Sequence, residues 1–199
     1  FLSSLTTAFF VYAGNYTLVF LLSLLLQYTM DMTPSGAGLI VLLQVLMVVF
    51  VSLLFTKRSF AVSQRALASI GCALVSLAFF LLSLVTSTTP FALVVLALLL
   101  NGIGIGMFTT PNNNLAMGAV NPDRLSSASA ILNLSRYLGN MAGTAVVMLL
   151  ITVFLGRSEI GPLNYEGLQQ VGRYAFIFAS LSTAIASLLA YRARPTVNR

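Results

Sequence analysis

Five polar side chains recur at helical spacing in the first long apolar stretch, residues 5–27. They are Tyr12, Asn15, Tyr16, Ser23 and Gln27. Their separations follow the three- and four-residue steps that bring side chains to one face of an α-helix. Such a stripe can hydrogen-bond a solute in a partly hydrated cavity, or it can hold neighbouring helices together at about 1 kcal/mol or less per bond. We interpret it as candidate cavity lining that faces the interior of a bundle, with Leu18, Leu21 and Leu25 turned towards lipid or neighbouring helices.

A second polar stripe lies in a later apolar stretch, residues 129–154. Its members are Ser129, Asn133, Arg136, Asn140 and Thr144, with Tyr137 beside them. We add Asn133 and Asn140 to the candidate cavity lining. Arg136 is the only ionisable residue that we place inside an apolar stretch, where a central charge costs about 2.5–3.5 kcal/mol. Arg136 can attract an anionic group or hold a gate, but its nearness to the helix end favours snorkelling or a structural pairing.

Glycine, proline and serine positions indicate close helix packing. The run Asn101-Gly102-Ile103-Gly104-Ile105-Gly106 is followed by Pro111 and three asparagines. These glycines lie inside an apolar stretch and not between a strand and a helix, so they form no dinucleotide-binding fingerprint. Pro111 predicts a kink or an unwound helix end, and Gly139 with Gly143 forms a further pair of small residues. A small face in the third stretch is also expected to pack, and its members are Ser69, Cys72, Ser76 and Ser83.

The composition excludes most functions of soluble proteins. Of the 199 residues, 58% are hydrophobic and 7% are charged, against about 25% charged residues in a soluble domain, so lipid must be the solvent. The net charge of +6 is spread in short clusters between apolar stretches, which does not suit a nucleic-acid-binding face. The chain has no histidine and one cysteine, Cys72. It therefore lacks the ligands of a zinc site and the base of a Ser-His-Asp triad, and we expect no catalytic site, no metal and no cofactor.

Six apolar stretches are each long enough to cross the hydrocarbon core, which takes about 20 helical residues. They cover residues 5–27, 36–55, 66–86, 91–110, 129–154 and 171–191. Turn-forming residues separate them, and Thr33 with Pro34 suits the cap and the first position of the second helix. The sequence thus predicts an all-α integral membrane protein with six transmembrane helices. The acidic residues are expected in the connections: Asp31, Asp123, Glu159 and Glu166.

Basic residues in the connections orient the bundle, because cytoplasmic loops are enriched in lysine and arginine. Seven lie on the side of the chain termini: Lys57, Arg58, Arg65, Arg124, Arg192, Arg194 and Arg199. Two, Arg157 and Arg173, lie on the opposite side. This bias predicts that both ends of the chain are cytoplasmic.

A weak internal repeat and three motifs point to a family. Ser35-Gly36-Ala37-Gly38-Leu39-Ile40 and Ser126-Ser127-Ala128-Ser129-Ala130-Ile131 open the second and fifth stretches in a similar way, as expected for three helices repeated with inverted topology. The junction from Gln27 to Gly38 and the glycine-rich run ending at Pro111 resemble the C-terminal half of drug exporters of the major facilitator superfamily. The stretch from Ser127 to Gly143, with its Asn, Arg and Gly-xxx-Gly spacing, is similar to the following helix in the 14-span drug:proton antiporter branch.

This resemblance implies a 3+3 inverted repeat that forms the C-terminal six-helix half of a major facilitator fold over residues 1–199. It implies a secondary transporter of a bacterial inner membrane, with small amphipathic molecules and protons as partners beside the lipid bilayer, and proton-driven efflux by alternating access. The family's N-terminal half is absent, and the sequence begins at Phe1, so we expect a piece of a longer protein. Either its missing part holds the proton-carrying acid or the protein is not proton-coupled. The alternative is a membrane scaffold or degenerate transporter fragment that does not transport.

Overall fold

The computed structural model describes residues 1–30, 32–57, 63–86, 89–156 and 165–192. Within these ranges the chain forms six long helices, one short 3-10 helix and no strand. The helices are α1 (Leu2–Thr29), α2 (Pro34–Lys57), α3 (Gln64–Ser83), α4 (Phe91–Met117), α5 (Leu125–Phe154) and α6 (Tyr165–Arg192), and η1 (Pro122–Arg124) precedes α5. All six long helices are long and apolar enough to cross a membrane. The predicted all-α membrane fold is therefore confirmed.

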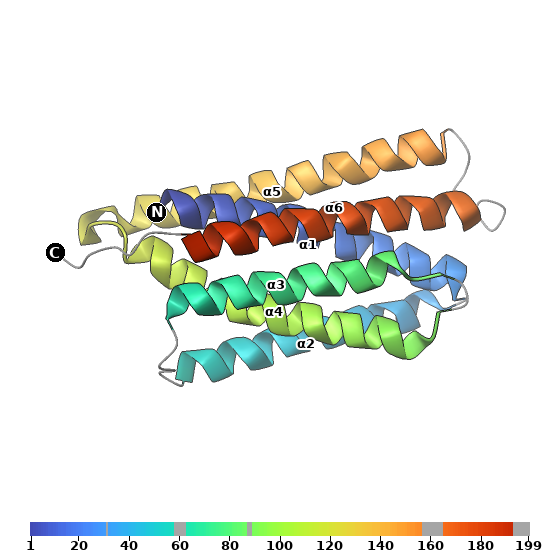
Figure 1. Ribbon diagram of the computed structural model, residues 1–199, viewed down its shortest axis with the longest axis horizontal. Helices are drawn as coiled ribbons and strands as arrows, with labels where there is room; N and C mark the ends of the chain where they lie inside the picture. Colours follow the sequence, from blue (N-terminus) through green and yellow to red (C-terminus); the bar gives the residue numbers. More distant parts are fainter. Residues whose placement is uncertain (31, 58–62, 87–88, 157–164, 193–199) are drawn as a thin grey trace.

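The helices lie side by side along the long axis of the molecule and alternate in direction (Figure 1). The N-terminus and the end of α6 lie at one end of the unit, together with η1. Seen in this view, α5 lies at the top and α2 at the bottom, with α1, α6, α3 and α4 between them. An even number of crossings thus brings both ends of the described chain to the same side.

The packing of the helices has the symmetry of a three-helix repeat. α1 packs on α6 and on α5, while α4 packs on α3 and on α2. Exchanging α1 with α4, α2 with α5 and α3 with α6 maps these contacts onto one another. Because α1 and α4 run in opposite directions (Figure 1), the repeat is inverted, which is the 3+3 arrangement that the sequence predicts.

The contact between α3 and α6 lies on the axis of this repeat and is built from paired serines. Ser76 Oγ donates to Ser180 O at 2.8 Å, and Ser180 Oγ donates to Ser76 O at 3.0 Å. Ser69 and Ser187 exchange the same two bonds, each at 3.0 Å. The small face of the third stretch therefore packs as predicted, because short side chains let two backbones approach closely enough to share hydrogen bonds. Cys72 lies buried on this helix as a free thiol.

Glycines set the other close helix contacts. On α4, Gly102 and Gly106 face α2, where an added Cβ would lie 2.8 Å from Gln44 O and 2.8 Å from Val51 Cβ. Gly104 faces the opposite way and meets Gly71 of α3, whose carbonyl oxygen would lie 2.6 Å from a Cβ. The alternating glycines thus allow α4 to pack closely against α2 and α3 at the same time.

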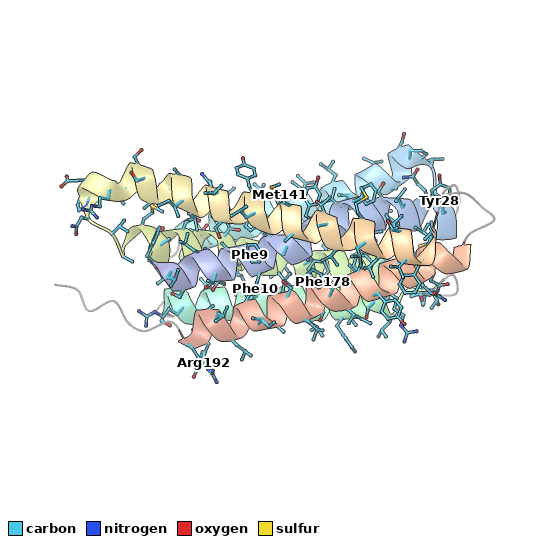
Figure 2. All side chains as sticks on the ribbon, turned by 90° about the horizontal axis from the view of Figure 1, so that it is seen from above. Phe9, Phe10, Tyr28, Met141, Phe178 and Arg192 are labelled. Carbon is cyan, nitrogen blue, oxygen red and sulfur yellow. The ribbon has the colours of Figure 1, made fainter. Side chains whose placement is uncertain are left out.

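On the other side of the unit, α5 packs on α1 through Gly139 and Gly143. A Cβ on either glycine would collide with a backbone carbonyl oxygen of α1, that of Phe9 or that of Ala13. Phe9 lies alongside α5 in Figure 2. The predicted small pair therefore makes a backbone-to-backbone helix contact.

The structure corrects three expectations about where helices begin and end. α4 does not unwind at Pro111 but continues to Met117, with Pro111 buried among neighbouring helices, where a proline is tolerated in membrane proteins. α5 begins at Leu125 and not at residue 129. Glu166 is the second residue of α6 and not part of a connection. The predicted cap is confirmed, since Thr33 Oγ1 accepts from Gly36 N at 3.2 Å.

Candidate functional site

The polar stripe of α1 lies on the surface of the six-helix unit. Tyr16 is 47% exposed, and the other four members are partly exposed. Leu18, Leu21 and Leu25 are buried against neighbouring helices, as predicted for the opposite face. The stripe therefore does not face the interior of this unit, because α5 and α6 pack on the other sides of α1 and leave the polar side open.

Two hollows flank the exposed aromatic side chains of this face. One, of about 410 Å³, is lined by Tyr16, Val19, Phe20, Ser23 and Leu24 of α1. The other, of about 160 Å³, lies between α1 and α5 and is lined by Tyr16, Phe20, Thr144, Val147 and Met148. Tyr16 and Phe20 are common to both hollows, so two aromatic rings stand between them. Apolar walls with a few hydroxyl groups suit an amphipathic ligand.

Some polar groups of the two stripes are hydrogen-bonded within their own helix. Gln27 Nε2 donates to Ser23 O and to Ser23 Oγ, each at 3.0 Å. Thr144 Oγ1 donates to Asn140 O at 2.8 Å. Asn15 Oδ1 is buried and has no hydrogen-bond partner in the described part of the chain. The Gln27 amide is therefore bonded within α1.

Arg136 joins three helices near the end of the unit that holds the termini. Its Nη2 donates to Asn113 Oδ1 of α4 in a short bond, and its Nη1 donates to Asn133 Oδ1 one turn earlier on α5 at 3.2 Å. The guanidinium also lies over the Tyr12 ring of α1, 5.4 Å from its centroid. The charge is thus held by amide oxygens and an aromatic face, which is a cation–π geometry.

The start of α5 shows how far the side chain of Arg136 lies from the end of its helix. Since α5 begins at Leu125, Arg136 lies about three turns from the helix end and pairs with α4 instead of snorkelling to the end of its own helix. Within this six-helix unit the guanidinium is therefore paired with α4. Its Nε is buried without a partner among the described residues, so these residues do not fully satisfy the guanidinium.

A polar pair that the sequence interpretation missed lies between α2 and α4. Gln44 Nε2 donates to Asn101 Oδ1 at 3.0 Å, and both side chains are buried. Asn101 Nδ2 has no partner among the described residues. The signal was available in the sequence, because Gln44 is a lone amide in an otherwise apolar helix. Asn113 was likewise noted only as one of three consecutive asparagines.

The described residues hold no group of three or more His, Cys, Asp or Glu side chains that could bind a metal ion. Asp123 lies exposed in η1. Asp31, Glu159 and the basic residues Arg58, Arg157, Arg194 and Arg199 lie outside the described ranges. The described side chains on the face of α1 and α5 can therefore offer a ligand hydrogen bonds, aromatic contact and the positive charge of Arg136.

Comparison with known proteins matches the Major Facilitator Superfamily model to residues 5–199. The chain is 24% identical over 200 residues to the multidrug efflux pump LfrA of Mycolicibacterium smegmatis, a match that covers 98% of this chain and 40% of that pump. It is 25% identical over 128 residues to the methylenomycin A resistance protein of Streptomyces coelicolor, covering 64% of this chain and 27% of that protein. The chain thus spans less than half the length of these relatives.

Proposed function

Because this chain belongs to the Major Facilitator Superfamily, we propose that it is the C-terminal six-helix half of a secondary transporter. The observation that supports this most is the polar and aromatic face of α1, which is exposed on a unit whose remaining surface is largely apolar. Polar groups such as Tyr16 are unfavourable against lipid and belong against protein or a water-filled cavity. A second helical half facing α1 and α5 would supply both.

We propose that the substrates are amphipathic small molecules that leave the cell. The hollows around Tyr16 and Phe20 combine apolar walls with hydroxyl groups, and one relative is named a multidrug efflux pump. In this scheme Tyr12, Asn15, Tyr16, Ser23, Gln27, Asn133 and Asn140 line the cavity. Aromatic rings would provide contact area, and the amides would orient the polar end of a substrate.

Arg136 is assigned to the gate side of this cavity. It bridges α1, α4 and α5 near the end that holds the termini, while Gly139 and Gly143 fix the α1 to α5 contact deeper in the bundle. Rocking of two halves changes which end of the cavity is open. A charge held only by amides and a ring can exchange partners at little cost during such a motion.

Proton entry is the proposed energy source. The acidic residues in the described ranges are Asp123 of η1 and Glu166, the second residue of α6, and we propose that the proton-carrying acid belongs to the other half. We also propose a bacterial inner membrane with both ends of the chain in the cytoplasm. A reporter fused after Arg199 should then report the cytoplasm, and a periplasmic signal would overturn this orientation.

The test is efflux by the full-length transporter in vesicles with an imposed proton gradient. We expect gradient-dependent movement of an amphipathic dye, lost in Tyr16→Ala and retained in Leu181→Ala. Leu181 is a matched control because it is 61% exposed but lies on the outer face of α6. Gradient-independent accumulation with equal behaviour of both variants would instead support a membrane scaffold that does not transport.

A further inference from the structure

A cavity lined by both polar and apolar side chains lies away from the face of α1 and α5, where α3 ends and α6 begins. Its volume is about 440 Å³. The polar part of its lining is Ser83, Thr86, Gln169, Gln170 and Arg173, and Leu84 with Val85 forms an apolar wall. The described lining therefore contains one positive charge and no carboxylate.

The length of α3 places this cavity at the boundary of the hydrocarbon core. α3 has 20 residues, which rise about 30 Å, the thickness of that core. Ser83 is its last residue, so the cavity opens at the level of the lipid headgroups. The position of α6 indicates the same level in the membrane. Gly172 of α6 lies against Leu25, since an added Cβ would contact the Leu25 side chain, and Leu25 lies one turn before α1 ends.

The helices that form the cavity also carry an apolar outer surface leading away from it. On α3, Leu77 and Phe80 are exposed, and on α6, Leu181 and Ile185 are exposed. A ligand whose polar part occupies the cavity could therefore continue along α3 and α6 as hydrocarbon. Free inorganic anions would gain nothing from this surface, whereas lipid acyl chains would lie on it.

We propose that the cavity binds the headgroup of an anionic phospholipid. The guanidinium of Arg173 would pair with the phosphate diester, whose single negative charge matches the single cation of the lining. The amides of Gln169 and Gln170 would hydrogen-bond the phosphate oxygens and the neutral polar substituent. In a zwitterionic headgroup the ammonium group would lie close to the Arg173 cation and would weaken this pairing. A guanidinium pairs with a phosphate group through charge-assisted and often bidentate hydrogen bonds.

Native mass spectrometry of the purified protein, titrated with phosphatidylglycerol or with phosphatidylcholine, tests the site. We expect phosphatidylglycerol to bind in preference to phosphatidylcholine. Arg173→Gln should weaken phosphatidylglycerol binding about fivefold, which corresponds to about 1 kcal/mol for the loss of one exposed ion pair. Arg192→Gln makes the same charge change at the far end of α6, where the side chain points away from the bundle (Figure 2), and should leave the affinity unchanged.

Two further measurements keep the lipid assignment falsifiable. Gln170→Leu, a neutral change at an exposed position, should also weaken phosphatidylglycerol binding, which covers the case that Arg173→Gln does not fold. Inorganic phosphate added at millimolar concentration should not displace the lipid. Displacement by phosphate, equal binding of the two lipids, or unchanged affinity in both variants would overturn the proposal.

Discussion

At the scale of single residues, Arg136 is the group on which the proposed transport cycle most depends. Replacing it by alanine removes a cation held by Asn113, Asn133 and Tyr12. We expect Arg136→Ala to lower the efflux rate per folded protein about tenfold, equivalent to about 1.4 kcal/mol on the slowest step. Arg136→Lys should restore only part of the rate, because an ammonium cannot reproduce the planar fork of the guanidinium.

The measurement is dye efflux from vesicles, normalised to folded protein. Arg124→Ala is the matched control, since Arg124 lies exposed in η1 and its loss should leave the rate unchanged. Full activity in Arg136→Ala would contradict a role of Arg136 in the transport cycle. Its role would then be limited to linking α4 and α5.

The buried pair of Gln44 and Asn101 gives a second prediction at this scale. Gln44→Leu would leave the whole Asn101 amide unsatisfied, so we expect a lower unfolding temperature in detergent. The double variant Gln44→Leu with Asn101→Leu should recover part of the loss, because no buried amide then remains. The coupling free energy should be about 0.6 kcal/mol, the average for hydrogen bonds between membrane helices, and should not exceed about 1.7 kcal/mol. Strictly additive effects would argue that the two side chains do not interact.

The sequence predicted the residues on each polar face but not their partners on other helices. Helical spacing alone places Tyr12 and Tyr16 on one side of α1, since the period is a local property. The pairing of Arg136 with Asn113 depends on how α4 and α5 are rotated about their axes, which no local pattern records. For the same reason the Gln44 to Asn101 bond could be suspected from a lone amide but not assigned.

At the scale of helices, the contact between α1 and α5 depends on the absence of side chains. Gly143→Ala should lower the yield of folded protein and the unfolding temperature, because its Cβ would collide with the backbone of Ala13 and overpacking of this kind costs about 1–3 kcal/mol. The control is Gly38→Ala on α2, where nothing lies within 4 Å of an added Cβ.

Gly38→Ala should be neutral or stabilising by up to about 1 kcal/mol, since alanine favours helix more than glycine does. The comparison uses thermal unfolding and monodisperse yield in the same detergent. Equal stability of the two variants would contradict the close approach of α1 and α5.

Helix boundaries were less predictable than helix identities. The apolar stretches reveal the spans because the hydrocarbon core imposes a length. The extension of α4 beyond Pro111 could not be read locally, because it requires neighbouring helices around the proline. The paired serines of α3 and α6 were partly predictable. The sequence indicated the small face of α3, but it did not indicate that α6 packs on this face.

At the scale of the whole molecule, the exposed face of α1 distinguishes a transporter half from a membrane scaffold. A lipid-facing surface and a cavity-facing surface are both exposed in the six-helix unit, so exposure alone does not separate them. Contact with water distinguishes the two surfaces, because a transport cavity is hydrated and a lipid-facing surface is not. The unit exposes Tyr16 at 47% and Leu181 at 61%, yet the proposed function places the first against an aqueous cavity and the second against lipid.

The most direct measurement is labelling of single cysteines by a membrane-impermeant thiol reagent in the full-length protein, in a Cys72→Ala background. We predict that Tyr16→Cys is labelled, that Leu181→Cys is not labelled because lipid covers it, and that the buried Leu18→Cys is not labelled because neighbouring helices cover it. An unreactive cysteine at position 16, matching position 181, would contradict a water-accessible cavity on this face.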